Sequence, residues 1–302
     1  MSEEYKYTVS ICNYNMENTI KESLLSILNN VNDDFEVLVV DESTDNSRKI
    51  IKKLQEKHDN LRLVEVQQDP GRNLGMMRNI GIREANGEFV LIYVDADDRY
   101  ECGIVDFAKI YEQLSEKLGK DFYIDGANIK ISSKDFLLNE VPHRNLPIAA
   151  AEEDFAIRLL YNNDIIYLDH TPFSEEIDKP DRKQKKTYGF KRSFRATVSR
   201  FQMGITFESL FKHMVVCDDR LETKDKLVNF IILPLAYLFS LPKQSYSVPD
   251  EFRDWKERDR RQPSLTYTLP ELEEKLNVSI DRDKLSECGR EKFYSVETGR
   301  WN

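Results

Sequence analysis

The feature that most constrains the fold is a regular alternation of short apolar runs with helical patterns. Four runs rich in aliphatic and β-branched side chains occupy residues 7–12, 35–40, 61–67 and 89–94. Such runs are typical of strands buried on both faces of a parallel sheet. Helical patterns separate them, and β-α-β units at this spacing form right-handed crossovers. The sequence therefore predicts an α/β fold with a mostly parallel central sheet flanked by helices.

The first helical pattern shows how the connecting helices are expected to form. Ile20, Leu24 and Ile27 recur at a spacing that places them on one face of a helix. Thr19 and Glu22 have the spacing of a capping box, in which two side chains bond backbone N–H groups at the helix start. We therefore expect an amphipathic helix capped by Thr19.

Polar residues follow each predicted strand at the point where it ends. They are Asn13-Tyr14-Asn15, Asp41-Glu42-Ser43, residues 69–73 and Asp95-Ala96-Asp97-Asp98. Ligands of open α/β sheets bind beyond the carboxyl ends of the strands. We therefore expect a ligand site along this edge of the sheet.

Composition narrows the classes of function. The chain has 302 residues, a net charge of -10 and four cysteines. The acidic balance disfavours bulk nucleic-acid binding, so no nucleic-acid partner is expected. The cysteines are far apart and form no CxxC pair, which predicts reduced thiols rather than a zinc site or a disulfide framework. The N-terminus lacks a signal-peptide pattern and no long apolar stretch follows, so we expect a cytoplasmic protein.

The pattern loosens after the fourth run. A helix is expected near residues 104–118, strands near 122–130 and 131–138, a helix that opens at Glu152, and a strand at 165–168. A basic run at 179–200 and an apolar run at 227–241 follow. We therefore predict an α/β nucleotide-sugar-binding and catalytic domain at residues 1–175 and a mainly helical, basic and apolar extension at 176–302.

The Asp95-Ala96-Asp97 turn is the first candidate for chemistry. Two carboxylates at i and i+2 after a buried strand present hard oxygen ligands to Mg²⁺ or Mn²⁺. Such an ion neutralises the charge of a departing diphosphate. An acidic turn that caps the next helix has about the same weight on spacing alone.

Five segments in order raise the weight of the metal interpretation. They are VSICNYN, VVDESTDNS, GRNLGMMRNIGIREANGEFV, VDADD and AAEEDFAIRLL. Together they resemble family 2 glycosyltransferases of the GT-A (Rossmann-like) fold over about residues 7–170, and their wording is similar to archaeal members. The resemblance implies an inverting, single in-line displacement that uses a nucleotide-sugar donor and a divalent metal.

The resemblance also implies a nucleotide pocket at the ends of the first two strands. Asn13, Tyr14 and Asn15 would line it, with the flat face of Tyr14 against the base. Asp41 would accept a hydrogen bond from the base or ribose, although an Asx-turn with Ser43 is the structural alternative. The family often has a second Asp where this chain has Glu42, so only Asp41 is carried over.

Further residues are implied at the diphosphate and the metal. Arg78 would approach the diphosphate with a planar guanidinium. Arg72 is a second candidate for this role. Asp95 would contact the ribose or brace the metal, and Asp97 would be the direct ligand. His170 would add a metal or phosphate contact, although a histidine at a strand end is more often structural.

The general base implied by the resemblance is Asp154, which would take the proton of the acceptor hydroxyl. Two acids precede it, so Glu153 is the alternative if the register is shifted by one residue. Polymerising members carry a QxxRW motif, and this chain has only Glu297 to Trp301 near its end. A single transfer is therefore the expected reaction.

Other functions and partners stay open at this stage. A sugar nucleotidyltransferase would need a glycine-rich, basic loop after the first strand, where this chain has Asn13-Tyr14-Asn15-Met16. A catalytically silent GT-A module that binds a nucleotide or scaffolds a complex is the second alternative. The acceptor is expected to be a glycan or a lipid-linked saccharide.

The C-terminal third carries a separate expectation about membranes. The apolar run at 227–241 is interrupted by Asn229 and Pro234, and it is too short to span a hydrocarbon core of about 30 Å. With the basic run at 179–200 it can instead lie on an anionic lipid surface. This predicts a peripheral protein on the cytoplasmic face, and an ordinary buried helix is the alternative.

Overall fold

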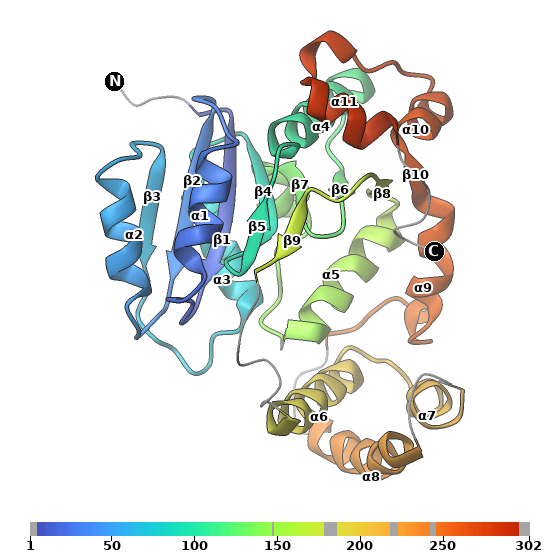
Figure 1. The fold of residues 1–302 in the computed structure, drawn as a ribbon. Coiled ribbons are helices and arrows are strands. Elements are labelled where there is room, and N and C mark those ends of the chain that lie inside the picture. Colours follow the sequence, from blue (N-terminus) through green and yellow to red (C-terminus); the bar gives the residue numbers. More distant parts are fainter. Residues whose placement is uncertain (1–4, 147, 178–185, 218–222, 242–245, 296–302) are drawn as a thin grey trace.

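The computed structural model describes residues 5–146, 148–177, 186–217, 223–241 and 246–295. Their centre is one large twisted sheet with helices on both faces (Figure 1). Its strands are β1 (Tyr7–Asn13), β2 (Phe35–Asp41), β3 (Leu61–Glu65), β4 (Phe89–Asp95), β6 (Tyr123–Asp125), β7 (Lys130–Ser133), β8 (Ile165–Asp169) and β10 (Thr266–Thr268). They lie in the order β10-β8-β6-β7-β4-β1-β2-β3.

The pairing confirms a mostly parallel sheet. β1 pairs in parallel with β2 and β4, β2 with β3, and β8 with β6 and β10. The exception is β7, which is antiparallel to both β4 and β6. In this register Asn13 lies opposite Asp41, and Cys12 lies opposite Asp95. The polar residues after β1, β2 and β4 are therefore neighbours at one edge.

Two apolar cores cover the two faces of the sheet. One contains Val9, Val37 and Leu91 and packs against α1 (Ile20–Leu28), α2 (Ser47–Gln55) and α4 (Ile104–Leu118). The other contains Val90, Ile92 and Tyr123 and packs against α3 (Leu74–Glu84) and α5 (Ile148–Asn162). Successive residues of β4 thus point to opposite faces, as expected for a strand buried on both sides.

The C-terminal third is mainly helical, as predicted. Its helices are α6 (Lys186–Gln202), α7 (Phe207–Phe211), α8 (Thr223–Ser240), α9 (Glu257–Arg261), α10 (Leu269–Leu276) and α11 (Glu287–Tyr294). Its short turns of helix are η3 (Lys212–Val216), η4 (Asp250–Phe252), η5 (Gln262–Leu265) and η6 (Arg282–Lys284). One further short turn, η1 (Phe136–Glu140), lies earlier in the chain, between β7 and α5. Helices α6, α7 and α8 form a group below α5 in Figure 1.

The predicted division at residue 175 stays a prediction, and the structure shows only which elements lie around that position. That position falls within β9 (Ser174–Glu176), which pairs with β5 (Asp98–Tyr100). The end of the chain then returns to the main sheet, because β10 extends that sheet and Leu269 and Phe293 belong to the first apolar core. The helical group of α6 to α8 is therefore better described as an insertion between two parts of one α/β unit.

Two cysteines correct the expectation of reduced thiols. Cys102, just before α4, and Cys288, on α11, form a disulfide with their Cα atoms 6.3 Å apart. Their sequence separation of 186 residues hides this proximity, which arises because the end of the chain packs back on α4 (Figure 1). Cys12 and Cys217 are free thiols. Disulfides are uncommon in reducing compartments such as the cytoplasm. The disulfide therefore does not support the predicted cytoplasmic location, which stays a prediction.

Element boundaries between residues 122 and 162 also differ from the expectation. The predicted strands become the short β6 and β7, and residues 136–140 form η1. Helix α5 begins at Ile148 rather than at Glu152, because the alanines of Ile148-Ala149-Ala150-Ala151 are strong helix formers that extend the helix toward its N-terminus. The acids at positions 152 to 154 therefore lie inside the helix and not at its first turn.

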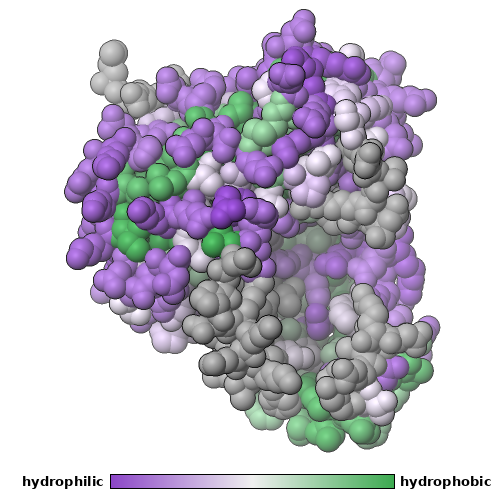
Figure 2. Space-filling model, in the orientation of Figure 1, coloured by the Kyte–Doolittle hydropathy of each residue, from purple (hydrophilic) through white to green (hydrophobic). Residues whose placement is uncertain are grey.

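Helix α8 has one buried and one exposed apolar face. Ile232, Leu233 and Ala236 are buried in the second core. Leu227, Ile231, Leu238 and Phe239 are each at least 60% exposed, and apolar atoms gather along the lower edge of the molecule in Figure 2, where α8 lies in Figure 1. Among the described residues, no helix is long and apolar enough to cross a membrane.

Candidate active site

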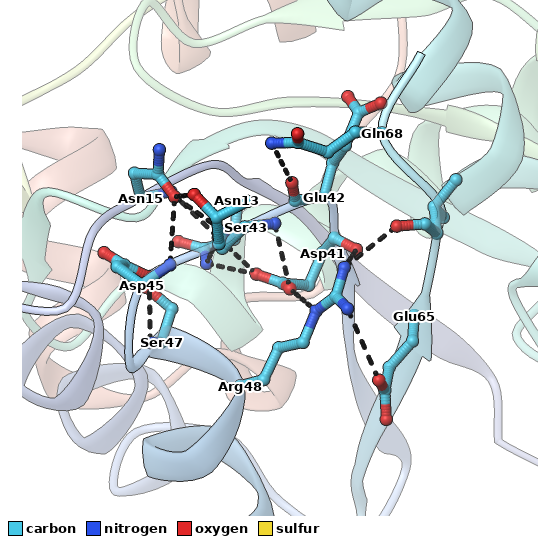
Figure 3. Close-up of polar contacts among 12 residues, drawn as sticks. Asn13, Asn15, Asp41, Glu42, Ser43, Asp45, Ser47, Arg48, Glu65 and Gln68 are labelled. Carbon is cyan, nitrogen blue, oxygen red and sulfur yellow. Dashed lines mark hydrogen bonds and ion pairs between the residues drawn. The ribbon is translucent and has the colours of Figure 1, made fainter.

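A closed hydrogen-bond network joins the ends of β1 and β2 (Figure 3). The Asn13 amide donates to Asp41 Oδ1 over 2.5 Å and to Ser43 Oγ over 3.0 Å. Ser43 donates its backbone N–H and its hydroxyl to the same Asp41 carboxylate. Asp41 is fully buried. Its carboxylate therefore fixes the shape of this corner, and in this conformation it does not face a ligand as predicted.

Arg48 completes this network, and no sequence motif singles it out. Its Nε donates to Asp41 Oδ2 over 2.5 Å, and its NH2 donates to the backbone oxygens of Asp41 and Val66. Arg48 is the second residue of α2, so the helix that follows β2 brings a cation back to the end of that strand. The charge of Asp41 is thereby matched inside the fold.

The loop after β1 is tied to the loop after β2. Asn15 has a positive φ of 54°, a conformation that asparagine tolerates better than most residues. Its Oδ1 accepts from the Thr44 backbone N–H over 2.8 Å, and its own N–H donates to Ser43 Oγ. Tyr14 between them is 57% exposed. Its ring is thus open to solvent on a fixed loop.

One acceptor in this region has no partner, because Asn13 Oδ1 is buried and receives no hydrogen bond from the described residues.

The Asp95-Ala96-Asp97 turn is held by its backbone. The Thr19 hydroxyl donates to Ala96 O over 3.0 Å, and the Ser23 hydroxyl donates to Asp95 O. Thr19 therefore does not form the predicted capping box, since its hydroxyl is used by this turn and the helix start has no side-chain cap. Asp95 is exposed and Asp97 is half-buried. Both carboxylates stand on a rigid support next to solvent.

Arg78 is the predicted diphosphate contact, and it is buried beside this turn. It comes from α3, is 5% exposed, and its guanidinium lies 3.6 Å from the centre of the Tyr93 ring. Its NH2 is 3.5 Å from Glu152 Oε1. Its NH1 makes no hydrogen bond within the part of the chain that the structure describes. A buried guanidinium with an unused donor is a favourable contact for an anion.

A β-bulge in β4 brings Tyr93 under Arg78. The register between β1 and β4 shifts between Val9/Leu91 and Ile11/Val94, so β4 has one extra residue there. Tyr93 has a φ of 62°, which is rare for a bulky residue and is found where surrounding structure enforces it. Bulges beside active sites redirect a side chain. Here the redirected ring supports Arg78 two residues before Asp95.

Arg72 lies on the far side of the β2 loop. Its NH1 pairs with Glu42 Oε1 over 3.0 Å and donates to Gln67 O. Glu42 Oε1 also accepts from the Asp69 backbone N–H. The residue that replaces the second Asp of the family therefore holds the loop after β3, and Arg72 is occupied by that contact.

The three acids of α5 face different neighbours. Asp154 is fully buried, and its two oxygens accept from Arg144 over 2.7 Å and Arg158 over 3.0 Å. Glu153 is paired with Arg200. Glu152 is partly exposed and lies on the wall of a cavity that Asp95 also lines. Of the three carboxylates, Glu152 is the one placed beside both Arg78 and the metal motif.

His170 lies in the aromatic core, where its ring contacts residues of α4 and α11. Its ring nitrogens are 2.9 Å from Thr171 O and 3.0 Å from Gly126 O. Its ring stacks on Phe173 at 4.9 Å and also contacts Phe107 and Phe293. Both oxygens are carbonyl acceptors, so a neutral ring donates to one of them, and the role of His170 as a metal or phosphate contact stays a prediction.

Two buried residues that the sequence did not indicate lie next to Tyr93. His143 is 4% exposed, stacks on Phe155 at 4.2 Å, and neither of its ring nitrogens is hydrogen-bonded to a described residue. Burial, with the charges of Arg78 and Arg158, lowers the pKa of His143 well below 6.5. Tyr123 is 1% exposed, and its hydroxyl likewise has no partner in the described chain.

The residues at the turn fit a divalent cation whose coordination is completed by substrate phosphates and water. No group of three His, Cys, Asp or Glu side chains that could hold a metal is found in the described residues. Mg²⁺ and similar ions are commonly held by one or two carboxylates together with substrate phosphates and water. Asp95 and Asp97 supply that number of carboxylates next to solvent, and the unpartnered Arg78 NH1 lies beside them.

Comparison with known proteins identifies the N-terminal part of the chain. Residues 8–126 match the family described as Glycosyl transferase family 2. This part of the chain belongs to glycosyl transferase family 2. The match covers β1 to β6 and therefore includes the Asn13 network, Arg78 and the Asp95-Ala96-Asp97 turn of this family 2 domain.

This chain matches only part of the length of the curated relatives of its family 2 domain. The cholesterol galactosyltransferase of Borreliella burgdorferi is 29% identical over 152 residues, which is 49% of this chain and 40% of that protein. The poly(ribitol-phosphate) beta-N-acetylglucosaminyltransferase TarS of Staphylococcus aureus is 38% identical over 96 residues, which is 31% of this chain and 16% of that protein. The chain thus spans less than half the length of these two relatives.

A solved structure extends the likeness of fold to most of the chain. The crystal structure of S. aureus TarS 1-349 in complex with UDP-GlcNAc matches with a TM-score of 0.51 at 19% identity. The match covers 90% of this chain and 92% of that chain. At this identity it shows the fold alone, and it confirms the predicted GT-A class with a mostly parallel sheet and a helical C-terminal part.

Proposed function

We propose that this chain is an inverting, metal-dependent glycosyltransferase that moves one sugar from a nucleotide-sugar donor to an acceptor hydroxyl. The observation that carries the proposal is the buried Arg78 guanidinium, whose NH1 has no partner in the described chain and which lies beside Asp95. Its NH2 already lies 3.5 Å from Glu152 Oε1, but a buried N–H donor that is left without a partner is unfavourable. The diphosphate of a nucleotide sugar would supply an acceptor for NH1 at the ligand edge of a family 2 domain.

The nucleotide would lie at the ends of β1 and β2. Asn13 Oδ1 is a buried acceptor without a partner in the described residues, so it can accept an N–H of the base. The exposed Tyr14 ring offers a stacking face, and Asn15 holds the loop that carries it. Asp41 acts indirectly in this proposal, because it orients the Asn13 amide. Arg72 would approach the diphosphate only by leaving Glu42.

Asp97 and Asp95 would hold Mn²⁺ or Mg²⁺ at the turn after β4. When bound, the ion neutralises charge on the diphosphate as it leaves. The chain itself contributes the fixed positions of the two carboxylates, which Thr19 and Ser23 maintain through the backbone. Arg78 adds a planar donor toward the same diphosphate.

We propose Glu152 as the general base in place of Asp154. Asp154 is fully buried and both of its oxygens accept from arginines, so it has no path to an acceptor hydroxyl. Glu152 lines the cavity next to Asp95. The acceptor oxygen forms a bond to the anomeric carbon, the bond from that carbon to the diphosphate oxygen breaks, and the hydroxyl proton passes to Glu152. Asp154 instead holds Arg144 and Arg158 in place.

An activity assay tests the function directly. The full chain is incubated with UDP-, GDP- and dTDP-sugars, Mn²⁺ and hydroxyl-bearing acceptors, and released nucleoside diphosphate is measured with a coupled enzyme. We expect release with at least one donor, and loss of release when the metal is chelated. Binding of a donor without release by any acceptor would favour the silent GT-A module. Release of pyrophosphate from a nucleoside triphosphate and a sugar phosphate would favour a nucleotidyltransferase.

We also propose that the exposed face of α8 rests on an anionic lipid surface and that the acceptor is lipid-linked or a glycan held there. The described basic side chains Arg195, Lys212 and Lys226 lie on α6, η3 and α8, and Glu208 on α7 is acidic. Apolar side chains that enter the interface and cations that meet anionic headgroups act together. Most of the predicted basic run at 179–200 lies outside the residues whose side chains the structure describes.

Vesicle flotation tests the lipid contact. The wild-type chain should float with vesicles that contain phosphatidylglycerol, less with phosphatidylcholine alone, and less at high salt. A variant with Leu227, Ile231 and Leu238 changed to Ser should stay in the soluble fraction. Equal recovery of the wild type and this variant with both vesicle types would contradict the contact.

A further inference from the structure

A cavity of about 420 Å³ lies between α5 and the sheet. Its wall includes Tyr123, Asp125 and Lys130 from the β6–β7 hairpin, Glu152 and Phe155 from α5, and Arg258 from α9. The volume falls in the range of small-molecule sites, about 300 to 1,000 Å³. The cavity therefore has the size of a binding site for a sugar ring and is built from several separate parts of the chain, including β4 and β8.

The polar groups around this cavity include an unusual share of atoms without partners. The Tyr123 hydroxyl is buried and makes no hydrogen bond to a described residue. Phe155, against which Tyr123 packs at 5.3 Å, also stacks on His143, whose two ring nitrogens are without hydrogen bonds in the described chain. A buried polar atom without a partner destabilises the folded chain. A ligand hydroxyl that bonds to Tyr123 would remove that destabilisation.

The charges on the wall point to a neutral ring. Lys130 pairs with Asp125 over 2.5 Å, and Arg258 pairs with Asp259 over 3.1 Å. Both cations of the wall are therefore already matched, Glu152 is paired with Arg78, and the Asp95 carboxylate adds a negative charge to the same wall. A phosphorylated ring or a uronate would meet repulsion, whereas hydroxyls can share the remaining lone pairs of these carboxylates. The aromatic rings of Tyr123 and Phe155 suit the apolar face of a sugar.

The position of Glu152 gives the cavity a direction. Glu152 stands on its wall and lies 3.5 Å from Arg78, the proposed diphosphate contact. On another part of the wall, Arg258 and Gln262 come from the segment that returns to the sheet after the helical insertion. A ring seated here would reach Glu152 at one point and the C-terminal part of the chain at another.

We propose that this cavity binds a neutral hexose ring of the acceptor, with the reacting hydroxyl directed at Glu152 and another hydroxyl bonded to Tyr123. This inference rests on the proposed function, because Glu152 is there assigned as the base. The acceptor class is then an uncharged terminal sugar, and the returning segment with Arg258 completes its site.

Ligand-observed NMR by saturation transfer tests the inference on the full chain. The probes are the methyl glycosides of glucose, galactose and mannose, with glucuronic acid and glucose 6-phosphate as anionic rings, all in the presence of Mg²⁺ and a nucleoside diphosphate. Ala156 lines the cavity, so Ala156→Phe fills it without changing a charge. Tyr123→Phe removes one hydroxyl, and Tyr294→Phe makes the same change on α11, where Tyr294 packs on the core at the other face of the sheet.

We expect at least one neutral glycoside to bind the wild-type chain and Tyr294→Phe. Ala156→Phe should abolish this signal, and Tyr123→Phe should weaken the affinity about tenfold, the value of one hydrogen bond of ordinary strength. The thermal midpoint of Tyr123→Phe should not fall, since its hydroxyl loses no partner in the described chain. A large fall in that midpoint would assign the hydroxyl to the fold and overturn its role in binding.

Three results would overturn the cavity as an acceptor site. They are a wild-type chain that binds no neutral glycoside, a preference for an anionic ring, and glycoside binding that persists in Ala156→Phe. Binding of UDP, GDP or dTDP with Mg²⁺ is measured in the same samples. If the nucleoside diphosphate binds and the glycosides do not, the cavity inference fails and the proposed function stands. If no nucleoside diphosphate binds, the proposed function itself fails.

Discussion

The two ends of the ligand edge differ in how far their buried polar groups are paired, although Asn13 Oδ1 at the first end also has no partner in the described chain. At the ends of β1 and β2, Asp41 is buried among donors from Asn13, Ser43 and Arg48 (Figure 3). Around Tyr93 and Phe155, Arg78 and other polar groups are buried with atoms that have no partner in the described chain. The first arrangement fixes a shape, and the second is stable only at a cost of about 1 to 3 kcal/mol for each group. We infer that ligands meet the second arrangement with their charged and hydroxyl groups.

The same contrast exists within one turn of α5. Asp154 is saturated by two arginines, while Glu152 two residues earlier faces a cavity. A saturated carboxylate supports structure, and a carboxylate on a cavity wall is available for proton transfer. Substitutions at these two positions should therefore separate activity from stability.

The largest effect is expected for Glu152→Gln. Turnover should fall by about 10² to 10⁴, the usual contribution of a positioned base, while donor affinity changes little. Initial rates at saturating donor and calorimetric donor titration measure the two quantities. Wild-type turnover in this variant would return the base to Asp154 or Glu153.

Asp154→Asn should show the opposite pattern. Removing one charge from a buried group that pairs with Arg144 and Arg158 is expected to lower the free energy of unfolding by about 3 kcal/mol. Urea denaturation followed by circular dichroism measures this loss. Turnover per folded molecule should stay within a few fold of the wild type. A variant that keeps full stability and loses turnover would make Asp154 catalytic.

Arg78→Gln should weaken the binding of a nucleoside diphosphate about 10- to 100-fold, because a charge-assisted hydrogen bond contributes about 1.5 to 3 kcal/mol. Arg48→Gln is the matched control at the saturated end. It leaves Asp41 without its cation, so it should lower the unfolding midpoint and leave the affinity of the folded fraction nearly unchanged. Equal loss of affinity in both variants would remove the contrast between the two ends.

The smallest effect concerns pH. The pKa of His143 is held well below 6.5 by burial and by the charges of Arg78 and Arg158, so the unfolded chain takes up this proton first as the pH falls. The stabilising contribution is complete above about pH 6.5 and is lost progressively below it. Thermal midpoints at pH 7.5 and 5.5 should therefore differ more for the wild type than for His143→Phe. An equal difference in the wild type and in His143→Phe would contradict this contribution.

Residues beside long periodic elements were predictable from the sequence. Apolar runs located β1, β2 and β4 within a residue or two, and a polar group after a buried strand has to lie at the sheet edge. This placed Asn13, Asp95 and Asp97 correctly in space. Arg78 is predicted as a diphosphate contact because the segment around it resembles a segment of the family. The order of the strands then determines which of these residues are neighbours.

The missed features all depend on contacts between distant segments. Cys102 and Cys288 meet only because the end of the chain packs on α4. Tyr93 matters because a bulge in β4 redirects it, and no local pattern signals the extra residue. His143 is a histidine in a loop until packing removes it from water. The proposed role of Glu152 rests on its place on the cavity wall, which depends on where α5 packs and not on the local sequence.

One titration tests the central claim that this edge binds a nucleoside diphosphate through a metal. UDP, GDP and dTDP are titrated by calorimetry into the wild type and Asp97→Ala, each with Mn²⁺ and with a chelator. We expect one nucleotide to bind the wild type at least about tenfold more tightly with Mn²⁺. Asp97→Ala should bind it weakly in both conditions with an unchanged thermal midpoint. Equal affinities in all four titrations would contradict the account.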